Sequence, residues 1–360
     1  MRNMRREFWA GKRVFITGHT GFKGSWLAMW LHELGAEVSG YALEPPTVPN
    51  MFGALGIGRR VSSIHGDVRD LEPLKSALDL FRPQIVLHLA AQSSVPRSYV
   101  SPVETYATNI MGTVNVLEAV RQVSGVRALV CVSSDKCYEN KEWVWGYREV
   151  DSLGGHDPYS SSKGCCELVV AGYRRSFFES PGAASSRTGV ATARAGNVIG
   201  GGDWSSGRLV PDLVRAVTGG STILLRHPEA TRPWQHVLDA LDGYLMLAEG
   251  LWGSTPDLAE GWNFGPPADV GTKVCDLVEL FLQTWGSHTG WKRAPGRTPH
   301  EARSLTLLSS KARERLKWWP KLDLEATVEW TVEWHKAFNE GRDMAVLTRE
   351  QIDRYESIVR

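Results

Sequence analysis

The sequence predicts an α/β fold, a doubly wound parallel sheet with a smaller, discontinuous C-terminal lobe. Segments typical of strands and of helices alternate through the first half of the chain, which indicates a parallel sheet with helices on both faces. An apolar run at residues 85–92 is typical of a strand in the middle of such a sheet. The length of 360 residues favours two lobes over a single core.

A glycine-rich turn separates the first strand from the first long helix. Residues 14–16 form a short apolar strand, residues 26–31 begin a helix, and Gly18, Gly21 and Gly24 stand between them. The helix N-terminus would present backbone N–H groups and the positive end of its dipole, which attract a pyrophosphate. The stretch therefore predicts a dinucleotide site, with a glycine-rich connection in a flavodoxin-like sheet as the alternative.

The other elements of the first half follow in order from their hydrophobic patterns. We expect strands at 38–43, 61–67, 85–92, 128–134 and 190–194, and helices at 70–81, 104–123 and 159–178. The strand ends carry small or polar residues. Because ligands bind beyond the carboxyl ends of parallel strands, several of these ends should converge on one crevice.

The character of the sequence changes near Gly200. Residues 200–207 are rich in glycine and predict a flexible loop, after which Arg, His, Pro and Trp become more frequent. We expect residues 1–197 to form the sheet domain, with a returning segment near 233–265. Residues 198–232 and 266–360 would form the smaller lobe.

Composition excludes several classes of protein. The net charge of +1 gives no basic field for nucleic acid. The five cysteines are an odd number without metal-ligand spacing, which favours free thiols in a reducing compartment. No apolar run reaches the length of a membrane span, and no secretory signal is evident, so we expect a cytoplasmic protein. Because His88, His227 and His300 share no ligand spacing, we expect no metal.

Tyr159 and Lys163 form a Y-x-x-x-K pair, which places both side chains on one face of the predicted helix. A lysine ammonium beside a phenol stabilises the phenolate, so Tyr159 could act as a base. Tyr and Lys at this spacing are also common on helix surfaces. The strand ending at Ser133 and Ser134 precedes this helix and could supply a hydroxyl to the same site.

In combination these motifs resemble the extended short-chain dehydrogenase/reductase family, over nearly the whole chain. The resemblance rests on the glycine loop, Asp67-Val68, His88-Leu89-Ala90-Ala91, Asn109-Ile110-x-Gly112-Thr113-x-Asn115, Ser133-Ser134-Asp135 and Tyr159-x-x-x-Lys163. It implies a Rossmann domain that binds NAD, a nucleotide-sugar substrate in the C-terminal lobe, and catalysis by Ser134, Tyr159 and Lys163.

The resemblance also implies which residues contact the cofactor. They are Gly18, Thr20, Gly21, Phe22, Lys23, Gly24, Asp67, Val68, Leu89, Ala90, Ala91, Gln92, Asn109, Ser133, Tyr159 and Lys163. No arginine directly follows the second strand to hold a 2′-phosphate, which agrees with NAD. An acidic ligand for the ribose is not distinct: its place falls near Ala42, with Glu44 two residues later.

Asp135 and Lys136 distinguish branches within this family. The 4,6-dehydratases carry two ionisable residues here, typically Asp-Glu, and the change to Asp-Lys resembles the branch that acts on CDP-glucose. By that resemblance, Tyr159 takes the 4-hydroxyl proton, Lys136 removes the C5 proton and Asp135 protonates the departing O6. Lys136 could instead only position the substrate.

The family pattern also assigns substrate contacts and an assembly. The substrate residues would be Ser93, Ser94, Val95, Asn197, Arg208, Leu209, Arg232, Arg297 and Glu301. Any one of these arginines taken alone could be a solvated surface charge. Helices 104–123 and 159–178 could form a four-helix interface in a homodimer or homotetramer, although their apolar residues could equally belong to the core.

Four alternatives remain beside the dehydration of CDP-glucose that the resemblance implies. The chain could dehydrate another nucleotide hexose or could be a 4-epimerase, although an epimerase needs neither an acid at O6 nor a base at C5. It could be a classical dehydrogenase that releases NADH. It could also be a non-catalytic NAD-binding regulator or scaffold, against which the intact Ser134, Tyr159 and Lys163 argue.

Overall fold

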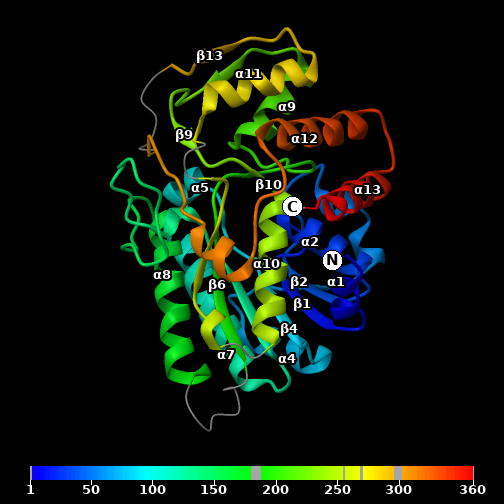
Figure 1. Cartoon of the computed structure of the whole chain (residues 1–360), viewed down its shortest axis with the longest axis vertical. Coiled ribbons are helices and arrows are strands. Elements are labelled where there is room, and N and C mark those ends of the chain that lie inside the picture. Colours follow the sequence, from blue (N-terminus) through cyan, green and yellow to red (C-terminus); the bar gives the residue numbers. More distant parts are fainter. Residues whose placement is uncertain (1, 180–187, 254–255, 268–270, 296–301, 360) are drawn as a thin grey trace.

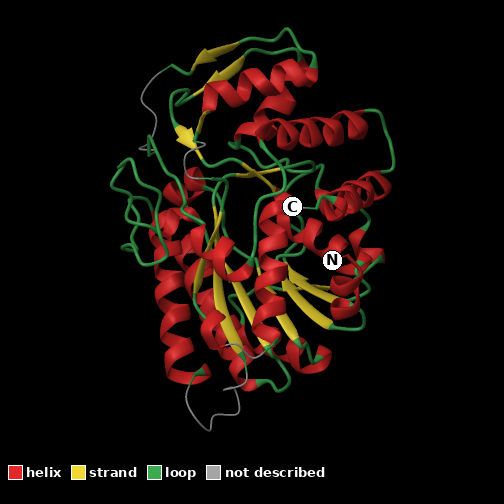
Figure 2. Ribbon diagram, in the orientation of Figure 1, coloured by secondary structure: helices red, strands yellow, loops and turns green. Residues whose placement is uncertain are grey.

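The computed structural model describes residues 2–179, 188–253, 256–267, 271–295 and 302–359. A large parallel sheet with flanking helices occupies one end of the molecule, and a smaller group of helices and short strands covers the other (Figures 1 and 2). The predicted fold class is confirmed.

Seven parallel strands form the sheet, in the order β11-β6-β5-β4-β1-β2-β3. Their bounds are β1 (Arg13–Thr17), β2 (Glu37–Ala42), β3 (Ser62–His65), β4 (Ile85–His88), β5 (Ala128–Val132), β6 (Gly189–Ala195) and β11 (Gly261–Phe264). The chain runs outward from β1 to β3 and then returns to pair β4 with the other side of β1. The strand order therefore reverses between β1 and β4, where doubly wound sheets open a crevice.

Helices cover both faces of the sheet because its strands are apolar on both sides. Val14 and Ile16 of β1 pack into the core under α2 (Phe22–Glu33), α10 (Val237–Trp252) and α13 (Met344–Ser357). Phe15, between them, points to the opposite core under α4 (Leu71–Phe81), α7 (Gly112–Gln122) and α8 (Pro158–Tyr173). This alternation is the two-residue period of a β-strand buried on both faces.

The second group of elements has its own hydrophobic core. It contains α9 (Leu209–Gly219), α11 (Val274–Trp285), α12 (Leu324–Asn339) and the strand pairs β8 (Ile223–Leu225) with β13 (Trp291–Arg293) and β9 (Thr231–Arg232) with β12 (Thr272–Lys273). A third pair joins β7 (Val198–Ile199) to β10 (Gln235–His236). The predicted lobe boundaries at 197, 232 and 265 stay a prediction.

The expected helices are present but not uniform. The segment predicted at 104–123 consists of α6 (Pro102–Tyr106), a π-helical turn at Ala107–Met111 and then α7. The helix predicted at 159–178 likewise ends in a π turn, at Arg174–Phe178. In the first half of the chain, α1 (Arg2–Trp9), α3 (Met51–Ala54) and α5 (Val95–Val100) were not expected from the sequence, and no individual helix was predicted after residue 178.

Residues 200–207 form a loop between β7 and α9, as expected, and Gly201 and Gly202 within it serve packing; the flexibility of the loop stays a prediction. A Cβ on Gly201 would lie 2.0 Å from Cγ of Trp334, and one on Gly202 would lie 2.1 Å from Sδ of Met51. Glycine is needed because two bulky side chains close on this backbone.

The five cysteines are free thiols, as expected, and only Cys165 is not buried. Over the described ranges, no helix combines the length and the apolar character needed to cross a bilayer.

A buried polar cluster joins α1, α10 and α13. Asp239 on α10 is fully buried and accepts hydrogen bonds from the backbone N–H of Lys321 (2.6 Å) and the hydroxyl of Tyr355 (2.8 Å). Asp242, one turn later, pairs with Arg5. Burial raises the pKa of Asp239 to about 7, although the Lys321 amide opposes this shift.

This raised pKa predicts a specific pH dependence of stability. Below the pKa that it has in the unfolded chain, Asp239 is protonated in both the folded and the unfolded state. Its stabilising contribution is lost as pH rises through its folded-state pKa of about 7. We expect the unfolding free energy of the parent, relative to Asp239→Asn, to fall by up to about 1.4 kcal/mol per pH unit between pH 4 and 7. Urea unfolding across this pH range measures the change in unfolding free energy. Asp79→Asn, at an exposed position of α4, is the control. A pH-independent difference for Asp239→Asn would contradict the prediction.

Candidate active site

A cavity of about 900 Å³ opens at the carboxyl ends of the central strands and continues between the sheet and the smaller group of elements. Residues directly after β1, β4, β5 and β6 line it, as do residues of α8, α9 and β9. The strand ends that the sequence predicts to converge therefore lie around one space.

The glycine loop between β1 and α2 forms one wall. Gly18 has a φ of +79°, and a Cβ on it would lie 2.7 Å from the backbone nitrogen of Ala90. A Cβ on Gly24 would lie 2.1 Å from the carbonyl oxygen of Gly18, whereas one on Gly21 would lie 3.5 Å from it. No side chain caps the N-terminus of α2. This close-packed turn at a helix N-terminus fits a dinucleotide pyrophosphate.

A chain of buried side chains supports this wall from behind. The Thr17 hydroxyl accepts hydrogen bonds from the backbone N–H groups of Leu89 and Ala90, both at 3.2 Å, and therefore donates to Nδ1 of His88 at 2.7 Å. Nε2 of His88 then donates to the Thr113 hydroxyl at 3.1 Å. Burial lowers the pKa of His88 to about 3, so the ring stays neutral in this role.

Asn109, which the family pattern places at the cofactor, lies behind the lining. It is buried, its Oδ1 accepts from the backbone N–H of Gln92 at 2.8 Å, and its Nδ2 donates to the Gln92 carbonyl at 3.0 Å. Nδ2 also donates to the Ser162 hydroxyl at 2.8 Å. The amide thus fixes the Gln92 backbone, and the π turn that contains Asn109 directs it there.

Tyr159 and Lys163 both line the cavity from the first turns of α8. The helix starts at Pro158 because the carboxylate of Asp157 accepts the backbone N–H of Ser160 at 3.0 Å. Lys163 is 5% exposed, and its Nζ is 3.4 Å from the carbonyl of Val132 at the end of β5. This contact holds the ammonium on the Tyr159 side of the cavity.

Asp135 and Lys136 lie on a short 3₁₀ turn after β5 that packs against α8, and Ser134 caps its N-terminus; all three line the cavity. The Ser134 hydroxyl donates to Oδ1 of Asp135 at 2.9 Å and accepts the backbone N–H of Lys136 at 3.2 Å. Burial raises the pKa of Asp135, against the opposing effects of the Lys136 charge and the Ser134 hydrogen bond. Oδ2 of Asp135 has no partner among the described residues. Asp135 can therefore hold and deliver a proton.

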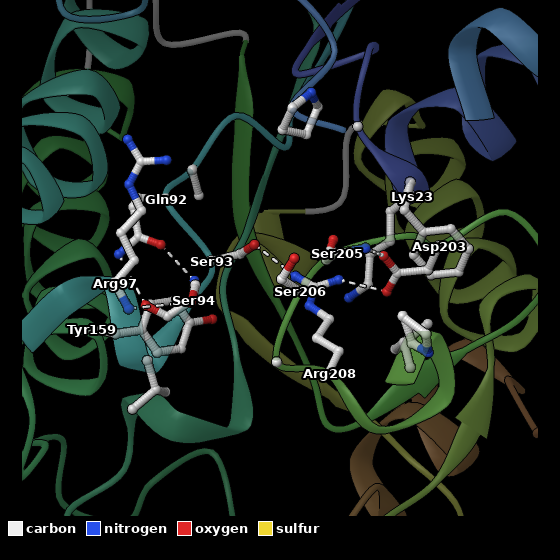
Figure 3. A pocket seen from close by; sticks show the side chains of 18 of the residues that line it. Lys23, Gln92, Ser93, Ser94, Arg97, Tyr159, Asp203, Ser205, Ser206 and Arg208 are labelled. Carbon is white, nitrogen blue, oxygen red and sulfur yellow. Dashed lines mark hydrogen bonds and ion pairs between the residues drawn. The ribbon is translucent and has the colours of Figure 1, made fainter. Parts of the chain in front are cut away.

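Arg208 lines the cavity between Ser93 and Asp203, in the middle of the view of Figure 3. Its guanidinium donates to Oδ2 of Asp203 at 2.9 Å and to the Ser93 hydroxyl at 2.6 Å. It therefore bridges the loop after β4 and the loop after β7. Asp203 was not among the predicted site residues, and its position five residues before Arg208 is the only signal for it in the sequence.

The other substrate candidates divide into two groups. Ser94, Val95, Asn197, Leu209 and Arg232 all line the cavity, whereas Arg297 and Glu301 lie outside the described residues. Arg232 is 4% exposed and acts on the charge of Asp135. Every predicted cofactor residue except Asn109 also lines the cavity.

Lys23 lines the cavity from the first turn of α2, where the charges of Arg208 and Lys163 act on it. Burial, followed by the charges of Arg208 and Lys163, lowers the pKa of Lys23 to about 7. An anion placed here would relieve that repulsion. Glu44 and Arg69, at the other end of the cavity, also line it.

The glycine loop yields a prediction with a built-in comparison. Gly21→Ala should fold normally, because its Cβ would make an ordinary contact at 3.5 Å, but the methyl group should lower NAD affinity at least about tenfold. Gly24→Ala should instead lower the unfolding free energy by about 1–3 kcal/mol, because its Cβ would overlap Gly18. Titration calorimetry and denaturant unfolding separate the effects, and unchanged NAD affinity in Gly21→Ala would refute this reading.

Comparison with known proteins agrees with this geometry. A family model described as GDP-mannose 4,6-dehydratase matches residues 15–331. A CDP-glucose 4,6-dehydratase of Salmonella typhimurium is 48% identical over 352 residues, which cover 98% of each chain.

Two solved structures of other proteins have a similar fold over most of this chain. A dTDP-glucose 4,6-dehydratase from Streptomyces venezuelae with NAD bound has a TM-score of 0.78 at 22% identity, covering 92% of this chain and 99% of its own. A UDP-glucose 4-epimerase from Thermus thermophilus in complex with NAD has a TM-score of 0.74 at 25% identity, covering 90% and 99%. This chain therefore belongs to the extended short-chain dehydrogenase/reductase family, in the group that the GDP-mannose 4,6-dehydratase model describes.

Proposed function

We propose that the protein is an NAD-dependent CDP-glucose 4,6-dehydratase, which converts CDP-D-glucose to CDP-4-keto-6-deoxy-D-glucose and water. The observation that carries the proposal is the joint presence in one cavity of the Tyr159–Lys163 pair and the Ser134–Asp135–Lys136 turn. The near full-length similarity to a CDP-glucose 4,6-dehydratase supports it.

The first chemical task belongs to Tyr159 and Lys163. The Tyr159 oxygen takes the proton of the 4-hydroxyl, while the Lys163 ammonium stabilises the phenolate that accepts it. The Ser134 hydroxyl would form a hydrogen bond with O4. Bound NAD would supply the acceptor for the electron pair that leaves C4 and the donor of the pair that later reaches C6. The loop from Gly18 to Gly24, Asp67, Val68 and the residues after β4 would hold it.

The second task belongs to Asp135 and Lys136. A ketone at C4 makes the C5 hydrogen acidic, so Lys136 as a base removes that proton while Asp135 protonates O6. The C6–O bond then breaks, a C5–C6 double bond forms and one water leaves. The C5–C6 double bond would then be reduced at C6, and a proton would return to C5. The overall reaction neither gains nor loses electrons. The raised pKa of Asp135 suits the acid.

The cations on the substrate side match a diphosphate. Arg232 is buried and Arg208 bridges two loops, so both are pre-oriented for phosphate oxygens. Asn197 also lines this region. The choice of cytosine as base rests on the similarity to the Salmonella enzyme.

The decisive experiment is a mass-spectrometric assay of the purified protein. CDP-glucose, dTDP-glucose and UDP-glucose are incubated separately, with and without added NAD. We expect loss of one water from CDP-glucose without net NADH. An unchanged mass with a new C4 epimer would instead indicate an epimerase. No conversion of any of the three would refute the proposal.

Variants at the turn assign the two halves of the elimination. Asp135→Asn should keep ketone formation at C4 but slow water loss by about a hundredfold, because general acid catalysis contributes on that order. Lys136→Ala should abolish exchange of solvent deuterium into C5. If Lys136→Ala exchanged at the parental rate, Lys136 would be a residue that only positions the substrate.

The cytoplasmic location stays a prediction. We infer that the protein forms a homodimer through α5, α6 and α8. Large apolar side chains are exposed on these helices, among them Val100 (82%), Val103 (80%) and Leu168 (62%). Exposed apolar side chains that cluster on neighbouring helices are typical of a protein interface.

The interface is tested by one charge. Leu168→Glu should shift the protein to monomer in sedimentation velocity, because the charge would be buried without a partner. Leu80→Glu on α4, where the parent side chain is 85% exposed, is the matched control and should not change the mass. A monomeric parent, or a dimeric Leu168→Glu, would count against this interface.

A further inference from the structure

A buried ion pair lies behind the 3₁₀ turn Asp135–Cys137, called the catalytic turn below. The pair is outside the cavity lining and has no part in the proposed reaction. Glu167 on α8 and Arg194 on β6 are 4% and 5% exposed. Nη2 of Arg194 donates to Oε2 of Glu167 at 2.7 Å, and the Thr192 hydroxyl donates to the same oxygen at 2.6 Å. Burial acts to raise the pKa of Glu167, but the charge of Arg194 and the hydrogen bonds from Arg194 and Thr192 together hold the pKa below its ordinary value.

Arg194 of this pair also contacts Tyr138, the residue that directly follows the catalytic turn. Nη1 of Arg194 donates to the Tyr138 hydroxyl at 2.7 Å, and the guanidinium lies over the Tyr138 ring, 5.1 Å from its centre. The Tyr138 hydroxyl donates in turn to Oδ1 of Asn263 on β11, at 2.7 Å. Tyr138 is therefore held by its hydroxyl, its ring and its backbone position in the turn.

This chain of contacts joins the two halves of the proposed machinery. Glu167 lies one helical turn after Lys163 and two turns after Tyr159, on the same helix. Tyr138 directly follows the turn that carries Asp135 and Lys136. The ion pair and the tyrosine hydroxyl thus form a short rigid connection between α8 and the catalytic turn.

Stability alone does not explain such an arrangement. A buried ion pair contributes little net stability compared with a well-packed apolar pair, because both charges lose their hydration. The planar guanidinium instead imposes distance and direction on every group that it contacts. The ring of Tyr138 also stacks on Tyr147, with centres 5.1 Å apart, so the ring position does not need the hydroxyl.

We propose that Glu167, Arg194 and Tyr138 are positioning residues that hold Asp135 and Lys136 in register with Tyr159. The inference rests on the proposed function. Ketone formation at C4 uses Tyr159 and Lys163 on α8, whereas water loss also needs the acid and base of the turn. Loosening the connection should therefore slow elimination more than oxidation.

Tyr138→Phe is the test variant, because it removes the hydroxyl and keeps the ring. Glu167→Gln would leave Arg194 buried without a counter-charge and could prevent folding. Tyr147→Phe is the matched control: its hydroxyl contacts the Lys141 amide and Asn140, away from Arg194. Both variants lose one hydroxyl from the same aromatic stack.

Two measurements are made on the parent and both variants. In rapid-quench mass spectrometry with CDP-glucose, Tyr138→Phe should accumulate the 4-keto hexose that has not lost water. Its elimination rate should fall about tenfold and its oxidation rate less than about twofold, the size expected for losing one positioning hydrogen bond. In hydrogen exchange without ligand, peptides spanning 133–139 should exchange faster in Tyr138→Phe only.

The outcomes separate this inference from the proposed function. If exchange of 133–139 is unchanged, or if Tyr147→Phe accelerates it equally, the positioning role is wrong whatever the enzyme does. Equal slowing of oxidation and elimination would also overturn it. A parent that dehydrates no sugar nucleotide refutes the proposed function and the catalytic part of the inference, whereas faster exchange in Tyr138→Phe alone would retain the structural connection.

Discussion

The attachment of the β1 tip to the β4 tip by the Thr17 hydroxyl is the constraint on which the remaining site depends. One oxygen accepts from the amides of Leu89 and Ala90 and donates to His88, at the point where the strand order reverses. The two backbones approach so closely that Gly18 cannot carry a Cβ. The glycine loop and the Gln92 wall are thus fixed relative to each other before any ligand binds.

Opposed charges give this scaffold its chemical selectivity. Lys23, Lys163, Arg208 and Arg232 line the same space from different elements, and the carboxyls of Asp135 and Asp203 lie among them. Asp203 pairs with Arg208. Burial acts to raise the pKa of Asp203, but the Arg208 charge and the hydrogen bonds from Ser205 and Arg208 together hold it below its ordinary value. Asp135 is left with a raised pKa instead. One carboxyl therefore orients a cation, and the other is suited to carrying a proton.

The sequence predicted the sheet well because its strands follow a simple physical rule. Strands buried on both faces are apolar throughout, and the glycine spacing has meaning only between a strand and a helix. What it missed was set by distant contacts. The side chain of Asn109 bonds to the backbone of Gln92, and the packing of Gly201 depends on Trp334, more than a hundred residues away. The pairing of Arg208 with Asp203 and Ser93 likewise arises only when the loops after β4 and β7 meet.

The edge strand β11 has a consequence for how the chain is made. It pairs with β6, but α9, β8 and α10 are inserted between them in the sequence. Asn263 on β11 also receives the hydroxyl of Tyr138 and donates its own amide to the carbonyl of Tyr147. During synthesis, β11 cannot complete the sheet, and Asn263 cannot bond to Tyr138 and Tyr147, until residue 264 has left the ribosome. Such long-range closure makes folding slow and exposes apolar edges meanwhile, so a nascent chain of this topology would depend on protection from aggregation.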